Sequence, residues 1–94
     1  MSMHDNALED FKNFPGIAEA WELIKTGVVV IREQLYRLEL WHSYSNPDIP
    51  YYVSISFLQG DAWKRMPDPP FAIGRDGDQA LREAMTFLTE RLAA

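Results

Sequence analysis

Two segments in the middle of the chain alternate between the two faces of a strand in their apolar and polar residues, the first over residues 35–44 and the second over residues 51–58. A period of two places successive side chains on opposite faces of a β-strand. Residues 46–48 between them have the composition of a turn. The pattern therefore predicts an antiparallel hairpin with one dry side. That side is formed by Leu38, Leu40, Val53 and Ile55.

A third strand and a helix are expected after the hairpin. The Gly-Asp pair at 60–61 predicts a tight turn into a strand over residues 62–66, because glycine adopts the positive φ such turns require. The prolines of segment 67–70 cannot donate to a sheet, so this segment is expected to be a stiff connector. Asp76 followed by Gln79 resembles a capping box and predicts a helix start. The apolar stripe of this helix is Ala80, Leu81, Ala84, Met85, Leu88 and Leu92.

The N-terminal part of the chain is expected to be helical after a disordered tail over residues 1–7. A short helical turn is expected over residues 8–14. In residues 17–24 the apolar residues recur with helical spacing, which predicts a helix that stops at Gly27. The residues that define this spacing are Ile17, Ala20, Trp21 and Ile24.

Residues 28–31 are β-branched at every position and are expected to form a strand. We find no turn composition between this run and the alternating segment that follows. Two interpretations of residues 28–44 therefore stay open. Either they form one long strand bent near Gln34 by a bulge, or they form a helix that uses apolar residues at helical spacing.

These elements predict a single α+β domain over residues 1–94 with the order α-β-β-β-α. Its antiparallel sheet would have three to four strands packed against the helices. A chain of 94 residues buries roughly 60–65% of its unfolded surface. Because such a small core is only marginally stabilising, we expect self-association, with a homodimer as the simplest form.

The charge and composition of the chain narrow the classes of partner and ligand that we expect it to bind. The net charge of -5 disfavours a phosphate backbone as a ligand, so we expect no nucleic-acid binding. The absence of cysteine excludes disulfides and thiolate metal sites. The chain shows neither an export signal nor an apolar run of about 18 residues, so we expect a cytoplasmic protein that does not bind membranes.

The sequence offers little catalytic chemistry. Ser54 and Ser56 lack the context of a hydrolase nucleophile and are expected on a solvated sheet face. We expect no catalytic residue, metal site or cofactor. A small-molecule pocket near His42 is an alternative, since histidine is the side chain best suited to proton transfer near neutral pH. Its walls would be His42, Tyr44, Tyr51 and Trp63.

The clearest functional signal is a set of interface-type residues on the outer side of the hairpin. Alternation places Trp41 and Tyr52 there beside Arg37, and Lys64 is expected to join them from the third strand. Tyrosine, tryptophan and arginine are the residues that most often anchor protein interfaces. The competing interpretation is that the first predicted helix covers this face, which would make both rings part of the core.

Two families resemble parts of this chain. The order helix, three strands, helix is similar to that of double-stranded-RNA-binding domains, but Asp76 and Asp78 stand where those domains place a lysine cluster. Residues 51–56 with the helix over residues 79–84 resemble the HicB type of antitoxin domain. We expect a non-enzymatic interaction module that self-associates. A small-molecule binder or minor enzyme, and an antitoxin or immunity-like protein, are the alternatives.

Overall fold

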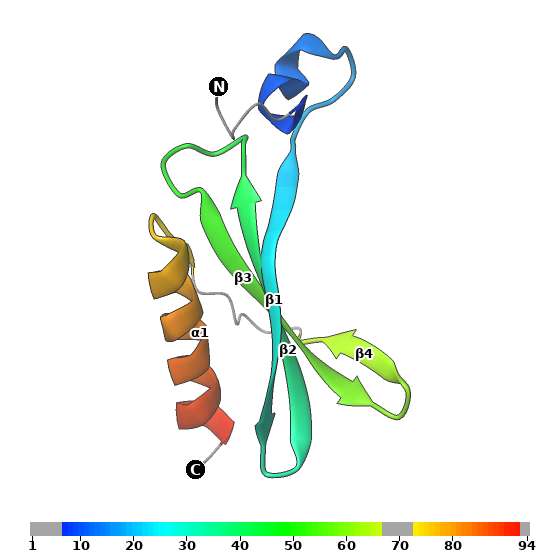
Figure 1. Cartoon of the computed structure of the whole chain (residues 1–94), viewed down its shortest axis with the longest axis vertical. Helices are drawn as coiled ribbons and strands as arrows, with labels where there is room; N and C mark the ends of the chain where they lie inside the picture. The colour runs from blue at the N-terminus through cyan, green and yellow to red at the C-terminus, as the bar shows by residue number, and fades with distance from the viewer. Residues whose placement is uncertain (1–6, 67–72, 93–94) are drawn as a thin grey trace.

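The computed structural model describes residues 7–66 and 73–92. They form a small α+β fold in which α1 packs along one face of an antiparallel sheet (Figure 1). The four main strands follow one another in the order β1-β2-β3-β4, and a short fifth strand pairs with the start of β3. The elements are η1 (Ala7–Asn13), β1 (Trp21–Ile31), β2 (Gln34–Ser43), β3 (Tyr51–Gln59), β4 (Ala62–Arg65), β5 (Ile73–Gly74) and α1 (Gly77–Leu92).

The hairpin of β2 and β3 confirms the register expected from the alternation. Leu38 lies opposite Ile55 and Leu40 lies opposite Val53, and all four side chains are buried. The turn into β4 is also confirmed, with Gly60 at a φ of 67°. Glycine tolerates this left-handed conformation because it has no Cβ.

The helix expected over residues 17–24 is wrong, because β1 begins at Trp21 and runs as a strand to Ile31. A β-bulge between Leu23 and Lys25 adds one residue to the strand. The extra residue breaks the period-two alternation, so that Trp21 and Ile24 imitate helical spacing. The strand expected over residues 28–31 is confirmed as the second half of β1.

Both interpretations of residues 28–44 are also wrong, because a sharp turn separates two strands there. Ile31 pairs with Gln34, and the two residues between them, Arg32 and Glu33, have φ values of 52° and 69°. Positive φ at both positions is the requirement of a type I′ turn. Such turns favour Asn and Gly, so an Arg-Glu pair gives no recognisable signal in the sequence.

The C-terminal helix begins as expected at Asp76, whose Oδ1 accepts from the backbone N–H of Asp78 at 2.9 Å and of Gln79 at 3.4 Å. The Gln79 amide donates to Glu83 rather than closing the predicted capping box. Of the predicted stripe, Ala80, Ala84 and Leu88 are buried, whereas Met85 is 43% exposed. The core therefore lies between one line of α1 and the centres of β2 and β3.

Two faces of the sheet can now be defined. The inner face, with Leu38 and Val53, packs on α1, and the outer face, with Trp41 and Tyr52, points the other way. Among the described residues α1 is the only α-helix, so the competing interpretation, in which a helix over residues 17–24 covers the outer face, is wrong. η1 lies beyond the end of the sheet, next to the start of β1 (Figure 1). Residues 1–6 of the expected tail and the connector 67–70 lie outside the described residues, and Ala7 begins η1.

Candidate functional site

The outer face carries a row of aromatic rings across three strands. Trp41 lies opposite Tyr52 in the register, with ring centroids 6.3 Å apart and planes 14° apart. Trp21 of β1 meets Tyr52 edge-on with centroids 4.9 Å apart. The indole and phenol predicted to share this face do so, and Trp21 joins them, a residue that the sequence had placed in a helix.

Polar groups lie beneath this aromatic row. Trp41 Nε1 donates to Ser54 Oγ at 3.1 Å, and Ser54 Oγ donates to Glu39 Oε1 at 3.3 Å. Ser54 and Ser56 are 1% and 6% exposed, so the expectation of a solvated serine face is wrong. Each serine side chain is small and lies between larger side chains. These larger neighbours cover it, which explains why both serines are buried. These hydrogen bonds fix the orientation of the Trp41 indole. The aromatic row therefore has a defined arrangement before any partner binds.

Arg37 completes the outer face through a contact that alternation alone does not predict. Its guanidinium lies over the Trp63 ring at 4.7 Å from the centroid, and its Nε is 4.0 Å from Glu39 Oε2. Lys64 does not join this group. It pairs with Phe57, which shares the inner face with Ile55, so Lys64 lies on the opposite side of the sheet. Trp63 therefore takes the place that was expected for Lys64.

The alternative pocket is assembled only in part. His42 lies against Tyr44 and Tyr51, with ring centroids 4.6 Å and 4.9 Å away. Trp63 does not belong to this cluster, because it lies opposite Leu58 at the other end of β3. Three of the four predicted pocket residues are thus neighbours, and the fourth lies on the outer face beside Arg37.

The tyrosine cluster is tied to β1 by a short hydrogen bond. Tyr44 donates its hydroxyl to Glu22 Oε1 at 2.5 Å. This bond, together with partial burial and the negative charge of Glu22, raises the pKa of Tyr44 to about 12. All three causes favour the neutral phenol, so this side chain acts as a hydrogen-bond donor at neutral pH.

The edge strand β1 is a feature that sequence reasoning missed. It exposes a series of apolar side chains, among them Leu23 at 43%, Val28 at 52% and Val30 at 63%. The β-branched run was recognised as a strand, but its position at the edge of the sheet depends on pairings that no local pattern reveals. Edge strands with exposed apolar residues are prone to pair with another chain.

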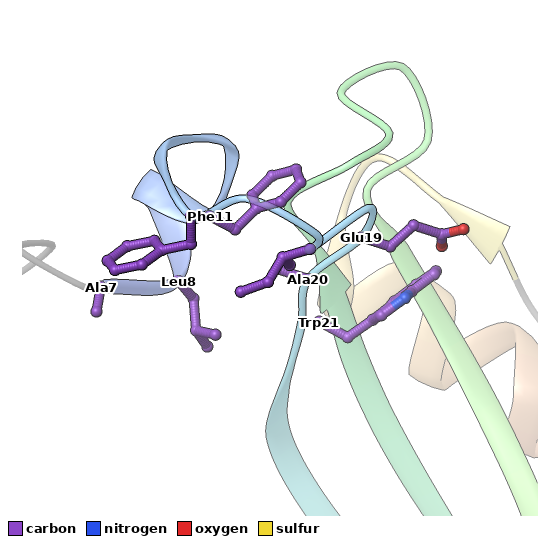
Figure 2. A pocket seen from close by; sticks show the side chains of 8 residues that line it. Ala7, Leu8, Phe11, Glu19, Ala20 and Trp21 are labelled. Carbon is purple, nitrogen blue, oxygen red and sulfur yellow. The ribbon is translucent and has the colours of Figure 1, made fainter.

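Two hollows adjoin β1. The larger, of about 440 Å³, lies at its N-terminal end and is lined mostly by apolar side chains, including Leu8 and Phe11 of η1 and Trp21 of β1, with the Glu19 carboxylate directed away from them (Figure 2). The smaller, of about 170 Å³, lies between β1 and α1, and its walls include Gly27, Val29, Leu81 and Met85.

No protein-family model, curated protein or solved structure matches this chain. Within residues 7–66 and 73–92, no three His, Asp or Glu side chains gather in a way that could hold a metal ion. No helix in this part of the chain is long and apolar enough to cross a membrane.

Proposed function

We propose that this chain is a non-enzymatic protein-interaction module that self-associates through the free edge of its sheet, strand β1. One observation carries the proposal: edge strand β1 exposes Leu23, Val28 and Val30 along its length, beside β2. Exposed apolar side chains that form a contiguous surface are a mark of protein contact sites. The fold leaves this edge accessible, because the buried side chains of α1 pack on β2 and β3.

The outer face has the amino-acid composition of a protein interface, and its side chains have little conformational freedom to lose on binding. Arg37, Trp41 and Tyr52 are each half-buried and held by ring stacking or a hydrogen bond. Side chains that are already ordered cost less conformational entropy on binding. In a dimer joined at β1, this face would remain available to a further protein. Lys64 has no part in this surface.

Self-association is tested by the molar mass in solution, measured by light scattering over about a hundredfold dilution series. The expected mass approaches twice the 10.9 kDa of one chain at the high end of the series. Added salt should strengthen the association, because it screens repulsion between two chains of net charge -5. A mass of one chain at every concentration and salt level would overturn the proposal.

The hollow beside η1 supports a second candidate function, the binding of a small apolar molecule. Its size falls in the range of ligand sites, and the side chains around it are mostly aromatic or aliphatic. Titration with the dye 8-anilinonaphthalene-1-sulfonate, followed by its fluorescence, tests this function. Saturable binding that Phe14→Ser weakens would support it. Absence of saturable binding, or binding that the substitution leaves unchanged, would contradict it.

A further inference from the structure

β1 has an unpaired edge that lacks the usual protection. β2 lies on one side of it, and within residues 7–66 and 73–92 no strand pairs with the other side. Natural edge strands are commonly blocked by charges, prolines or bulges. β1 has its bulge near Ile24, but residues 26–31 contain neither a charge nor a proline. Six residues are thus open to a further strand.

The phase of the β1–β2 hairpin determines which backbone groups point outward. In a hairpin closed by a two-residue turn, the residues that flank the turn direct their N–H and C=O groups toward each other. These residues are Ile31 and Gln34. Because the direction alternates along an antiparallel ladder, the backbone groups of Thr26, Val28 and Val30 point away from β2.

We propose that β1 pairs antiparallel with β1 of a second copy of this chain, about a two-fold axis at Val28. The pairing deepens the proposed function and rests on it, since it names the contact through which the chain self-associates. In this register Val28 lies opposite Val28, and Thr26 lies opposite Val30. The outward-directed backbone groups of one copy then meet those of the other, and the two sheets become continuous.

The small hollow between β1 and α1 selects this register. A two-fold axis at Val28 puts Val29 of the second copy opposite Gly27, and the reverse. A Cβ built on Gly27 would meet nothing within 4 Å, and the 170 Å³ hollow opens beside this position. The side chain of the second copy's valine has the size and apolar character to occupy this space. The Gly27 position beside the hollow and the valine that would fill it both belong to β1. A second copy of this chain therefore supplies the matching residue, which favours it over an unrelated partner.

Charge also favours a second copy at this position. β1 contains one acidic and one basic residue, Glu22 and Lys25, whereas the whole chain has a net charge of -5. The axis lies within the uncharged stretch, so the paired segments bring no like charges of β1 together. It also covers Val28, Val30 and Met85, which are 52%, 63% and 43% exposed in one copy.

Two substitutions test the pairing through the dissociation constant of the dimer, measured by sedimentation equilibrium. Val30→Lys places a charge opposite Thr26, and Gly27→Leu fills the hollow that the second copy's Val29 would enter. We expect each to raise the dissociation constant at least about tenfold. Ile49→Lys is the matched control, because Ile49 is 45% exposed in the β2–β3 loop, away from the edge. This control should leave the constant unchanged.

A cross-link gives a second readout that does not depend on a loss of binding. The chain contains no cysteine, so Val28→Cys introduces one thiol per copy. Two such thiols adjacent to the axis should form a disulfide between copies under mild oxidation, each losing one proton and one electron to the added oxidant. Ile49→Cys should remain uncross-linked. Circular dichroism confirms that each variant keeps its fold, and the cross-link decides if Val30→Lys does not fold.

The outcomes separate the pairing from the proposed function. If the unaltered chain is a monomer at every concentration, both are wrong. If the chain is a dimer but Val30→Lys and Gly27→Leu bind as tightly and Val28→Cys gives no cross-link, self-association stands and the β1 pairing is overturned.

Discussion

Tyr44 donates its hydroxyl to Glu22 Oε1 at 2.5 Å, and this hydrogen bond joins the residue after β2 to the beginning of β1. The backbone N–H of Tyr44 also donates to the Ala20 carbonyl at 2.9 Å. β1 is thereby anchored at the end where its neighbours on the outer face are aromatic. The bond matters for the edge strand, since it fixes the end remote from the hairpin turn.

The pH dependence of stability follows from the Tyr44 pKa. Because the folded state raises this pKa from 10.0 to about 12, folding favours the protonated phenol. The stabilisation is complete below pH 10 and is lost as the pH rises toward 12, since only the unfolded chain releases this proton in that interval. Urea unfolding at a series of pH values should show this decrease. Tyr44→Phe lacks the titrating group and should show less of it.

Tyr44→Phe should also lower the free energy of unfolding at neutral pH by about 1 kcal/mol, because it removes a hydrogen bond to a half-buried carboxylate. The Tyr51→Phe variant is the control, since Tyr51 contacts His42 but has no such bond to Glu22. Equal stability of Tyr44→Phe and the unaltered chain across the alkaline range would contradict the role given to this pair.

The turn between β1 and β2 should be improved by Arg32→Asn combined with Glu33→Gly. Both positions have positive φ, which costs L residues with long side chains more than Asn or Gly. We expect the double variant to be more stable by about 1 kcal/mol in urea unfolding. A matched change at Asn46→Gly, in the longer β2–β3 loop, should not stabilise. A loss of stability in the double variant would show that the turn is not of the primed type.

The Asp76 cap should contribute measurably to the stability of α1. Asp76→Ala deletes the acceptor of the Asp78 and Gln79 backbone N–H groups and should cost about 1 kcal/mol. Asp76→Asn keeps an acceptor oxygen and should recover most of the loss. Thermal unfolding followed by circular dichroism measures both. If Asn is as damaging as Ala, the effect comes from charge near the helix terminus rather than from capping.

The sequence predicts the part of this fold that local chemistry determines. The Leu38–Ile55 register, the Gly60 turn and the Asp76 cap each follow from a pattern contained in a few residues, and each is present. The pattern of residues 17–24 predicts a helix instead of a strand, because the bulge in β1 imitates helical spacing. The turn at Arg32 and Glu33 was missed because tertiary pairing holds these residues in a conformation that they do not favour.

The candidate site also has a part that local sequence patterns predict and a part that depends on the pairing of strands. Period-two alternation placed Arg37, Trp41 and Tyr52 on one face, as observed. The same rule could not place Lys64 or Trp63, because the phase of β4 depends on its register with β3. The exposure of β1 was beyond any local pattern, since an edge strand and a central strand can have the same β-branched sequence.

The outer face and the β1 edge are separated by a double variant, Trp41→Ala with Tyr52→Ala. Both rings are half-buried and Trp41 donates to Ser54, so the unfolding free energy should fall by about 2–4 kcal/mol. The dissociation constant of the dimer should change by less than about threefold, because neither ring lies on the paired edge. Sedimentation equilibrium measures the constant and urea unfolding the stability. Trp41→Phe, which keeps a ring and loses only the Nε1 donor, is the milder control. If the double variant is a folded monomer while Val30→Lys remains a dimer, two copies meet through their aromatic faces instead of their edges.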